Sequence, residues 1–373
     1  MTHSPSVLMM IVGFILLLGP LVVIHELGHY LVARWCGVKA DAFSVGFGKE
    51  LVGLTDRRGT RWKLSAIPLG GYVQFAGDMD PTSRPDDAKF AHLSPEERAQ
   101  TFNAKPLWQR ALIVAAGPLT NLLFAILIFS AFNMAFGRVV APPVVAAFAE
   151  KSAARDAGLR VGDRIVAVNG HAIRQFPDIV GLVVPYPGMT VAITVARDGR
   201  ELAIPVRLED KLLKDEFGNE SRIGRLGIAP GGARIERVGP AEAVTLAGQQ
   251  TWGIVRMLGV GIRQIVTGQR SIAELGGPIK TAKYSGEQLS LGWLSFASFA
   301  AFISINLAFI NLLPIPALDG GHLALYAAEA VRRRPLDARS QDLAYRTGLA
   351  FVLALMLFVT LNDLASLLPA GGS

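Results

Sequence analysis

The sequence predicts a polytopic α-helical membrane protein with four transmembrane helices and one inserted soluble α/β module. Hydrophobic residues make up 51% of the 373 residues, and charged residues only 18%. The apolar residues gather in long uncharged runs and do not form the stripes of amphipathic soluble helices. Between the second and third runs lies a long stretch of mixed charge with glycine-marked turns, which is typical of a soluble domain.

Each predicted transmembrane helix depends on one uncharged run, since about 20 mostly apolar residues are needed to cross a bilayer. The runs are Val7–Ile24, Leu112–Phe136, Leu289–Leu318 and Thr347–Asn362. With their flanks they place the four helices at 1–36, 107–137, 289–322 and 347–369. The fourth run is the shortest, so a buried soluble helix is the alternative there. The first run lacks the basic start and the small-residue cleavage site of a signal peptide.

Lysine and arginine predict the orientation of these helices, because cytoplasmic loops carry an excess of both. Segments 37–106 and 323–346 are rich in them, whereas the first ten residues and the tail after Asp363 have none. We therefore expect both segments in the cytoplasm and both termini outside, together with residues 138–288. The net charge of +7 mostly reflects this topology, and no nucleic-acid partner is expected.

The first apolar run leads directly into His25-Glu26-Leu27-Gly28-His29. Residues four apart lie on one face of a helix, so His25 and His29 can point at a common ion. Glu26 can reach a water on that ion, which is the arrangement of zinc metalloproteases. Two alternatives remain for these residues: an ordinary helix end facing the cytoplasm, and a proton relay in a transporter.

The third apolar run ends at an acidic residue, Asp319, in an unusual setting. Pro314 and Pro316 stop the helix before it, and two glycines follow it. Irregular backbone at membrane depth is tolerated only where it is buried in protein or lines a cavity. Asp319 is therefore a candidate functional residue. The first and third helices run in the same direction, so Asp319 and the histidine pair lie at the same end.

With these motifs the chain resembles the site-2 proteases, specifically the bacterial RseP-type regulated intramembrane proteases. The motifs that carry the resemblance, besides the His-Glu-x-x-His pattern, are Asn311-x-x-Pro-x-Pro-x-Leu318-Asp319-Gly320, Gly46-Phe47-Gly48, Pro68-Leu69-Gly70-Gly71-Tyr72-Val73, Gly117-Pro118-x-x-Asn121 and Gly276-Gly277-Pro278-Ile279. The resemblance implies a Zn²⁺ cofactor held by His25, His29 and Asp319. It also implies that Glu26 is the general base and that Asn311 contacts the substrate.

Residues 61–76 predict two short strands around a turn at Pro68–Gly71. In the resembled family this hairpin enters the membrane, and an extended substrate pairs with its edge. The resemblance thus implies substrate contacts at Gly70, Gly71, Tyr72 and Val73. Strand addition would satisfy the backbone groups that are freed when a substrate helix unwinds. The alternative is a hairpin on the cytoplasmic surface.

The inserted module spans 138–232 and is expected outside the membrane. Asn169-Gly170 predicts a tight hairpin, and Asp198-Gly199 predicts a turn between strands 191–197 and 202–208. The pattern from Ser152 to Gly170 resembles a bacterial PDZ domain. By the same resemblance, Leu226-Gly227-Ile228 forms its peptide-binding loop. The module could bind peptide ends or act as a steric filter for bulky substrates.

Residues 233–288 follow the module and contain an amphipathic pattern. Trp252, Val255, Leu258, Ile262 and Ile265 recur at helical spacing, while Arg256, Arg263 and Gln264 fall off that face. The pattern predicts a helix at the membrane surface, with the tryptophan at the interface. A helix packed on the inserted module is the alternative.

The resemblance implies a zinc-dependent intramembrane endopeptidase of a bacterial inner membrane, with both termini periplasmic and the active site near the cytoplasmic side. The implied partners are the lipid bilayer, single-span membrane substrates such as anti-sigma factors or remnant signal peptides, and an upstream site-1-type protease. Two other classes stay open: a transporter with His25, Glu26 and Asp319 as a relay, and a PDZ-bearing membrane scaffold with a degenerate site. The complete set of ligand types disfavours the scaffold, and the lack of inverted repeats disfavours the transporter.

Overall fold

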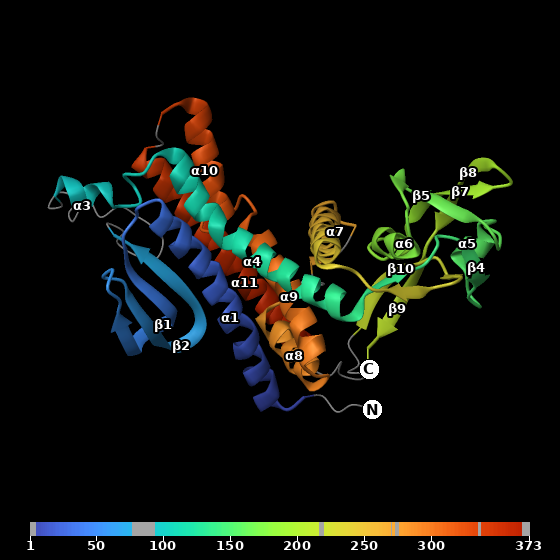
Figure 1. Cartoon of the computed structure of the whole chain (residues 1–373), viewed down its shortest axis with the longest axis horizontal. Coiled ribbons are helices and arrows are strands. Elements are labelled where there is room, and N and C mark those ends of the chain that lie inside the picture. Colours follow the sequence, from blue (N-terminus) through green and yellow to red (C-terminus); the bar gives the residue numbers. More distant parts are fainter. Residues whose placement is uncertain are drawn as a thin grey trace. The chain divides into compact units, whose positions relative to one another are not determined.

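The computed structural model describes residues 5–76, 94–215, 220–269, 271–272, 276–334 and 337–367. The chain divides into two compact units (Figure 1). The first, here called the membrane unit, comprises Pro5–Ile128 and Ser271–Ser373. The second, the insert unit, comprises Phe129–Arg270. Each unit has its own buried hydrophobic core.

Four helices of the described chain are long and apolar enough to cross a membrane, as the sequence predicts. They are α1 (Val7–Trp35), α4 (Leu107–Phe136), α9 (Trp293–Asn311) and the segment Gln341–Ala365 of α11 (Ala338–Leu367). Their surfaces are largely apolar and exposed, which suits a lipid environment. The chain therefore has the architecture of a membrane protein with four candidate spans.

The third and fourth helices differ from their expected limits. The run Leu289–Leu318 is interrupted at its start, where α8 (Pro278–Ser290) ends and Gly292 adopts a φ of 106° before α9 begins. At its other end α9 stops at Asn311, because Pro314 lacks a backbone N–H and restricts the residue before it.

The segment expected as a cytoplasmic loop, 323–346, is mostly helical. It contains most of α10 (Asp319–Arg332) and the beginning of α11. The apolar run from Thr347 is thus only the later part of a longer helix. Polar residues before that run continue the helix, which hydropathy alone does not reveal.

A bent antiparallel pair of strands lies beside α1 (Figure 1). It consists of β1 (Ala40–Thr55) and β2 (Arg61–Phe75). Phe43 of β1 pairs with both Trp62 and Val73, so the first half of β1 lies between the two ends of β2. Residues 71–75 therefore form an outer edge, which pairs with no further strand in the described chain. The chain reversal predicted around Pro68–Gly71 lies inside β2: residues 61–64 and 71–75 run in opposite directions along the first half of β1, and Gly70 between them has a φ of 112°. The two arms do not pair with each other as in a simple hairpin, because β1 lies between them.

Aromatic packing fixes this sheet against the end of α1. Tyr30, which directly follows the histidine pair, makes an edge contact with Trp62 at 5.2 Å between ring centroids. Trp62 stacks on Phe43 at 4.5 Å, and Phe43 is 1% exposed. Such pairs add to the burial of apolar area, so the sheet is held at a defined place beside the helix.

Helix α8 packs closely on the first half of α1. A Cβ on Gly13 would lie 2.8 Å from the Ser285 carbonyl carbon, and one on Gly286 would lie 2.9 Å from Met10 Cα. Small residues let membrane helices approach in this way. The buried Asp363 carboxylate of α11 accepts from the backbone N–H groups of Gly277 and Lys280, which satisfies donors at the start of α8.

The insert unit is built around a four-stranded sheet with the order β6-β5-β7-β8. Its sheet strands are β5 (Arg164–Val168), β6 (His171–Ala172), β7 (Thr190–Arg197) and β8 (Arg200–Arg207). Further pairs are formed by β3 (Arg138–Val140) with β12 (Arg234–Glu236), β4 (Val145–Phe148) with β11 (Ile228–Pro230), and β9 (Glu209–Lys214) with β10 (Glu220–Arg225). Two short helices of this unit are α5 (Ala153–Asp156) and α6 (Phe176–Val183). A separate short helix, α3 (Pro95–Ala99), belongs to the membrane unit.

Both turns predicted for the insert are confirmed. Asn169 and Gly170 have φ values of 48° and 76°, and Asp198 and Gly199 have 50° and 77°. Positive φ at both central residues is the signature of the hairpin turns that match the twist of the strands. The β9–β10 pair between β8 and β11 has no counterpart in the sequence-based prediction.

Helix α7 (Pro240–Val266) packs within the insert unit on one face. Ala243 and Ala247 are fully buried, and the buried Gln264 side chain donates to the Pro185 carbonyl at 2.8 Å. Trp252, in contrast, is 68% exposed. The buried face of α7 therefore agrees with the alternative of a helix packed on the module. The face that carries Trp252 is exposed, and its contact with a membrane surface stays a prediction.

Candidate active site

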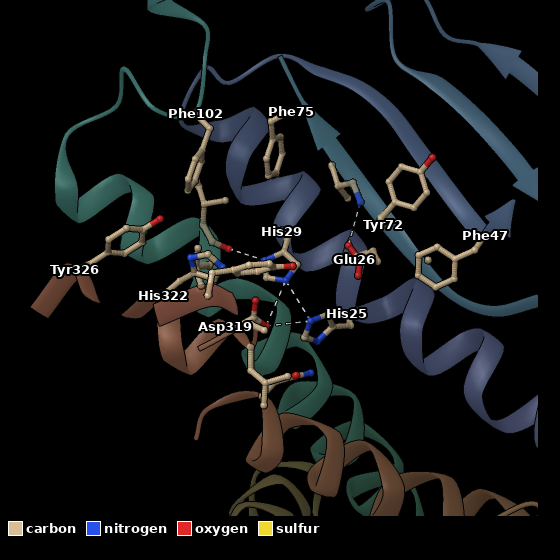
Figure 2. A pocket seen from close by; sticks show the side chains of 18 residues that line it. His25, Glu26, His29, Phe47, Tyr72, Phe75, Phe102, Asp319, His322 and Tyr326 are labelled. Carbon is tan, nitrogen blue, oxygen red and sulfur yellow. Dashed lines mark hydrogen bonds and ion pairs between the residues drawn. The ribbon is translucent and has the colours of Figure 1, made fainter. Parts of the chain in front are cut away.

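Three side chains suited to bind a metal converge in the membrane unit (Figure 2). His25 and His29 come from α1, and Asp319 is the first residue of α10. The Nε2 atoms of the two histidines are 3.2 Å apart. Asp319 Oδ2 lies 3.1 Å from His25 Nε2 and 3.6 Å from His29 Nε2. A tetrahedral zinc with bonds of about 2.0–2.2 Å separates its ligand atoms by about 3.3–3.6 Å. The triangle thus has the size that a zinc ion requires.

Two further features fit a cation at this place. Asp319 Oδ2 is buried and receives no well-directed hydrogen bond from the described residues, which is costly for a carboxylate unless a cation satisfies it. His29 Nδ1 lies 2.8 Å from the Ile113 carbonyl oxygen of α4. Since a carbonyl only accepts, Nδ1 carries the proton, and the lone pair of Nε2 faces the centre of the triangle.

Glu26 lies beside the triangle and links it to the outer strand. Its Oε2 accepts a hydrogen bond from the Val73 backbone N–H at 3.1 Å (Figure 2). This bond joins α1 to the edge of β2. The carboxylate therefore has a fixed orientation next to the position where a metal and its water would lie.

A cavity of about 270 Å³ opens onto these groups. Four of the residues expected to contact substrate line it: Gly71, Tyr72 and Val73 of β2, and Asn311 at the end of α9. Much of the remaining wall is aromatic and was not predicted from the sequence. These additional aromatic residues are Phe47, Phe75, Phe102, Tyr326 and Tyr345.

Comparison with known proteins decides the family. The model for peptidase family M50 matches residues 13–355. The chain belongs to peptidase family M50. A "putative zinc metalloprotease" of Agrobacterium fabrum is 46% identical to this M50 peptidase over 362 residues, covering 96% of each chain. The "Metalloprotease MmpA" of Caulobacter vibrioides is 37% identical over 384 residues and also covers 96% of each chain.

Among solved structures, the PDZ domain of an SdrC-like protein from Listeria monocytogenes is 20% identical, with a TM-score of 0.19. That match covers 24% of this chain and 85% of the other. Membership in a peptidase family comes from the full-length match alone. This family membership excludes a transporter and a non-enzymatic scaffold as the general class of this protein.

Two glycines allow α1 and α4 of the M50 peptidase to meet at the histidine pair. A Cβ on Gly117 of α4 would lie 2.8 Å from His25 Nε2 and would collide with His29 Nε2. A Cβ on Gly28 of α1 would overlap the Thr120 hydroxyl and the Ala116 carbonyl. The sequence places Gly117 in a motif but does not indicate this contact, which no local pattern encodes.

The segment between α9 and α10 places Asp319. Ala317 has a φ of 85°, which is strained for a residue with a side chain. Gly320 and Gly321 lie against the backbone of residues 312–316, and a Cβ on Gly321 would lie 2.7 Å from Pro316 Cα. The glycine pair therefore lets α10 start directly on the proline segment and turns the carboxylate towards α1.

Gly70 is the predicted contact that does not line the cavity. Its positive φ and the close approach of the Phe47 ring show a structural role at the bend of β2. His322, on the first turn of α10, is a lining residue that lies outside the three-ligand group. It was not among the predicted ligands.

The predicted peptide-binding loop lies in the insert unit. Leu226, Gly227 and Ile228 line an apolar groove of about 350 Å³ together with α6. Leu213 and Ile223 of the β9–β10 hairpin line the same groove. Gly227 has a φ of 74° at the start of β11. The structure thus brings the loop and a helix together around an apolar depression.

Proposed function

We propose that this M50 peptidase is a zinc-dependent intramembrane endopeptidase in which His25, His29 and Asp319 hold the ion and Glu26 is the general base. The observation that carries the proposal is the triangle of ligand atoms beside a fixed carboxylate, at the end of a helix long enough to span a membrane. The names of the relatives as zinc metalloproteases support the choice of metal.

The chemistry expected at this site is peptide hydrolysis. Zinc, when bound, polarises the scissile carbonyl and lowers the pKa of its water towards neutrality. Glu26 takes a proton from water and delivers it to the leaving amine nitrogen. The Val73 N–H orients Glu26 for this transfer.

The substrate is proposed to bind as an added strand on residues 71–75. Val73 directs its N–H away from β1 and towards the cavity, so alternate residues of this edge present backbone groups to an incoming chain. Strand pairing would satisfy the peptide groups of an unwound substrate helix, which lipid cannot do. Glu26 and the substrate would then meet at the same edge.

The sheet is further proposed to enter the membrane. Its exposed surface includes large apolar side chains that would be unfavourable in water, among them Leu51, Val52, Leu54 and Ile67. The lysine and arginine distribution supports periplasmic termini and an active site near the cytoplasmic side of a bacterial inner membrane.

Single-span membrane proteins are the proposed substrates, including anti-sigma factors trimmed by an upstream site-1-type protease and remnant signal peptides. A substrate whose region outside the membrane is short or already trimmed would suit the cavity beside His25, His29 and Asp319, which is proposed to accept one extended strand. The insert is proposed to be a PDZ domain that filters or binds substrates, which its apolar groove supports. Trp252 of α7 is proposed to contact the membrane surface.

The test uses the purified full-length protein in lipid nanodiscs with a single-span model substrate. Glu26→Gln should keep about one zinc per chain, as in the wild type, yet lower cleavage at least about 100-fold, because only the proton transfer is lost. Asp319→Ala should lose zinc and activity together. Cleavage retained by Glu26→Gln, or an undiminished zinc content in Asp319→Ala, would contradict the assignment.

A further inference from the structure

His25 has a polar neighbour on its second nitrogen that the proposed mechanism does not use. Its Nδ1 lies 3.4 Å from the side-chain nitrogen, Nδ2, of Asn121 on α4. Asn121 is only 1% exposed. Its side-chain oxygen, Oδ1, is buried and has no hydrogen-bond partner in the described part of the chain. A buried amide oxygen without a donor is unfavourable, so a donor is expected beside it.

The protonation of the imidazole decides which end of the amide can face it. If the Asn121 NH₂ faces Nδ1, this nitrogen must accept, and the ring proton lies on Nε2. That proton would point at Asp319 Oδ2, which is 3.1 Å away, and would occupy the lone pair needed by a metal. If the amide oxygen faces Nδ1, the nitrogen donates to it and the lone pair of Nε2 is free.

We propose that Asn121 is the positioning residue of His25: its side-chain oxygen accepts from Nδ1–H and thereby directs Nε2 at the metal. The inference rests on the proposed role of His25 as a ligand. It requires the Asn121 amide to be turned by about 180°, which brings the orphan oxygen to the donor that metal binding creates. The partner of His29 is also on α4, where the Ile113 carbonyl accepts from Nδ1 at 2.8 Å. One helix therefore orients both imidazoles, through its main chain in one case and a side chain in the other.

The Asn121 backbone is itself held from a third helix. The Ser304 hydroxyl of α9 donates to the Asn121 carbonyl at 2.8 Å, and Ser304 is fully buried. Helix α9 ends at Asn311, just before the segment that carries Asp319. A chain of contacts from α9 through Asn121 to His25 thus ties the ligand of α1 to the element that leads to the third ligand.

The experiment measures zinc affinity by competition with a chelator, using the full-length protein in detergent. Asn121→Leu should bind zinc about 10- to 100-fold more weakly, the usual effect of removing a partner that orients a metal-bound histidine. Asn121→Asp should bind at least as tightly as the wild type, because either carboxylate oxygen accepts from Nδ1–H. Rescue by aspartate separates hydrogen-bond acceptance from simple packing.

A matched control lies on the same helix. Asn133 is 6% exposed, and its amide contacts Gln250 of α7. Asn133→Leu removes a buried amide but no neighbour of the histidines, so its zinc affinity should equal that of the wild type. Wild-type affinity in Asn121→Leu, or equally weak binding in Asn121→Leu and Asn121→Asp, would overturn the inference.

The variant His25→Ala distinguishes a failure of the proposal about Asn121 from a failure of the proposed function. Zinc retained by His25→Ala would reject the ligand set itself, and with it both proposals. Zinc lost by His25→Ala but kept at wild-type affinity by Asn121→Leu would reject only the role of Asn121.

Discussion

Replacing Gly117 by alanine should remove zinc from the site by moving its ligands. The added Cβ would lie 2.8 Å from His25 Nε2, whereas ordinary van der Waals contact begins at 3.4 Å. The His25 ring would therefore have to move away by about 0.6 Å. His29 Nε2 lies closer still and must move further. Metal–ligand distances tolerate deviations of only about 0.2 Å. The methyl group is attached to the backbone of a helix, so it cannot rotate away.

We expect zinc binding by Gly117→Ala to weaken at least about 100-fold, which corresponds to about 2.7 kcal/mol. Alanine favours a helix by up to about 1 kcal/mol relative to glycine, so the substitution does not weaken α4 as a helix. The loss should therefore appear in metal content and not in helix content. Metal analysis after dialysis, chelator competition and circular dichroism measure these quantities.

Gly19→Ala is the matched control on α1. No atom lies within 4 Å of the Cβ that it would add, and it has the same gain in helix propensity. This variant should keep the zinc affinity of the wild type. If Gly117→Ala bound zinc as tightly as Gly19→Ala, the close approach of α4 to the imidazole pair would be refuted.

Two further predictions concern the substrate edge and the insert unit. Val73→Pro removes the backbone N–H that donates to Glu26, at an outer edge of the sheet where proline is tolerated. This variant should cleave substrate about 10-fold more slowly or worse, while its zinc content stays at the wild-type level. Unchanged cleavage would contradict the role of Val73 in orienting Glu26. In the insert, the Arg197 guanidinium donates to the Asp163 carboxylate at 2.6 and 2.7 Å and holds its pKa below the usual range. The stabilisation is therefore complete above about pH 4 and is lost as the pH falls through the lowered pKa. Asp163→Asn should destabilise the insert by about 3 kcal/mol at neutral pH and flatten its acid dependence. Hydrogen exchange of β5 and β7 in the whole protein, corrected for intrinsic rates, measures both effects, and an acid dependence equal to that of the wild type would refute the second.

The outer strand shows what a local sequence pattern leaves open. Pro68, Gly70 and Gly71 are turn residues, so a hairpin turn is the local expectation. In the fold the chain does reverse within β2 near Gly70, but its two arms pair with the first half of β1 and not with each other. The hydrogen bonds gained by this pairing are long-range, and short-range propensity does not contain them.

The third and fourth helices make the same point for hydropathy. A run of apolar residues predicts a span, but it does not say where the helix starts or stops. Gly292 and Pro314 set the limits of α9 through backbone geometry, and polar residues extend α11 before its apolar run. Hydropathy thus identified the helices that can cross a membrane and left their ends undetermined.

The sequence by itself determined that the chain is a membrane protein and that His25, Glu26 and His29 share one end of its first helix. Both follow from local properties: the length of apolar runs and the 3.6-residue period, which places residues four apart on one face. Only the tertiary structure brought Asp319 to that face and placed Gly117 and Asn121 of α4 against the imidazoles. These contacts join distant parts of the chain, so they depend on how closely the helix backbones pack. That distance is set by the glycines that lie where the helices meet.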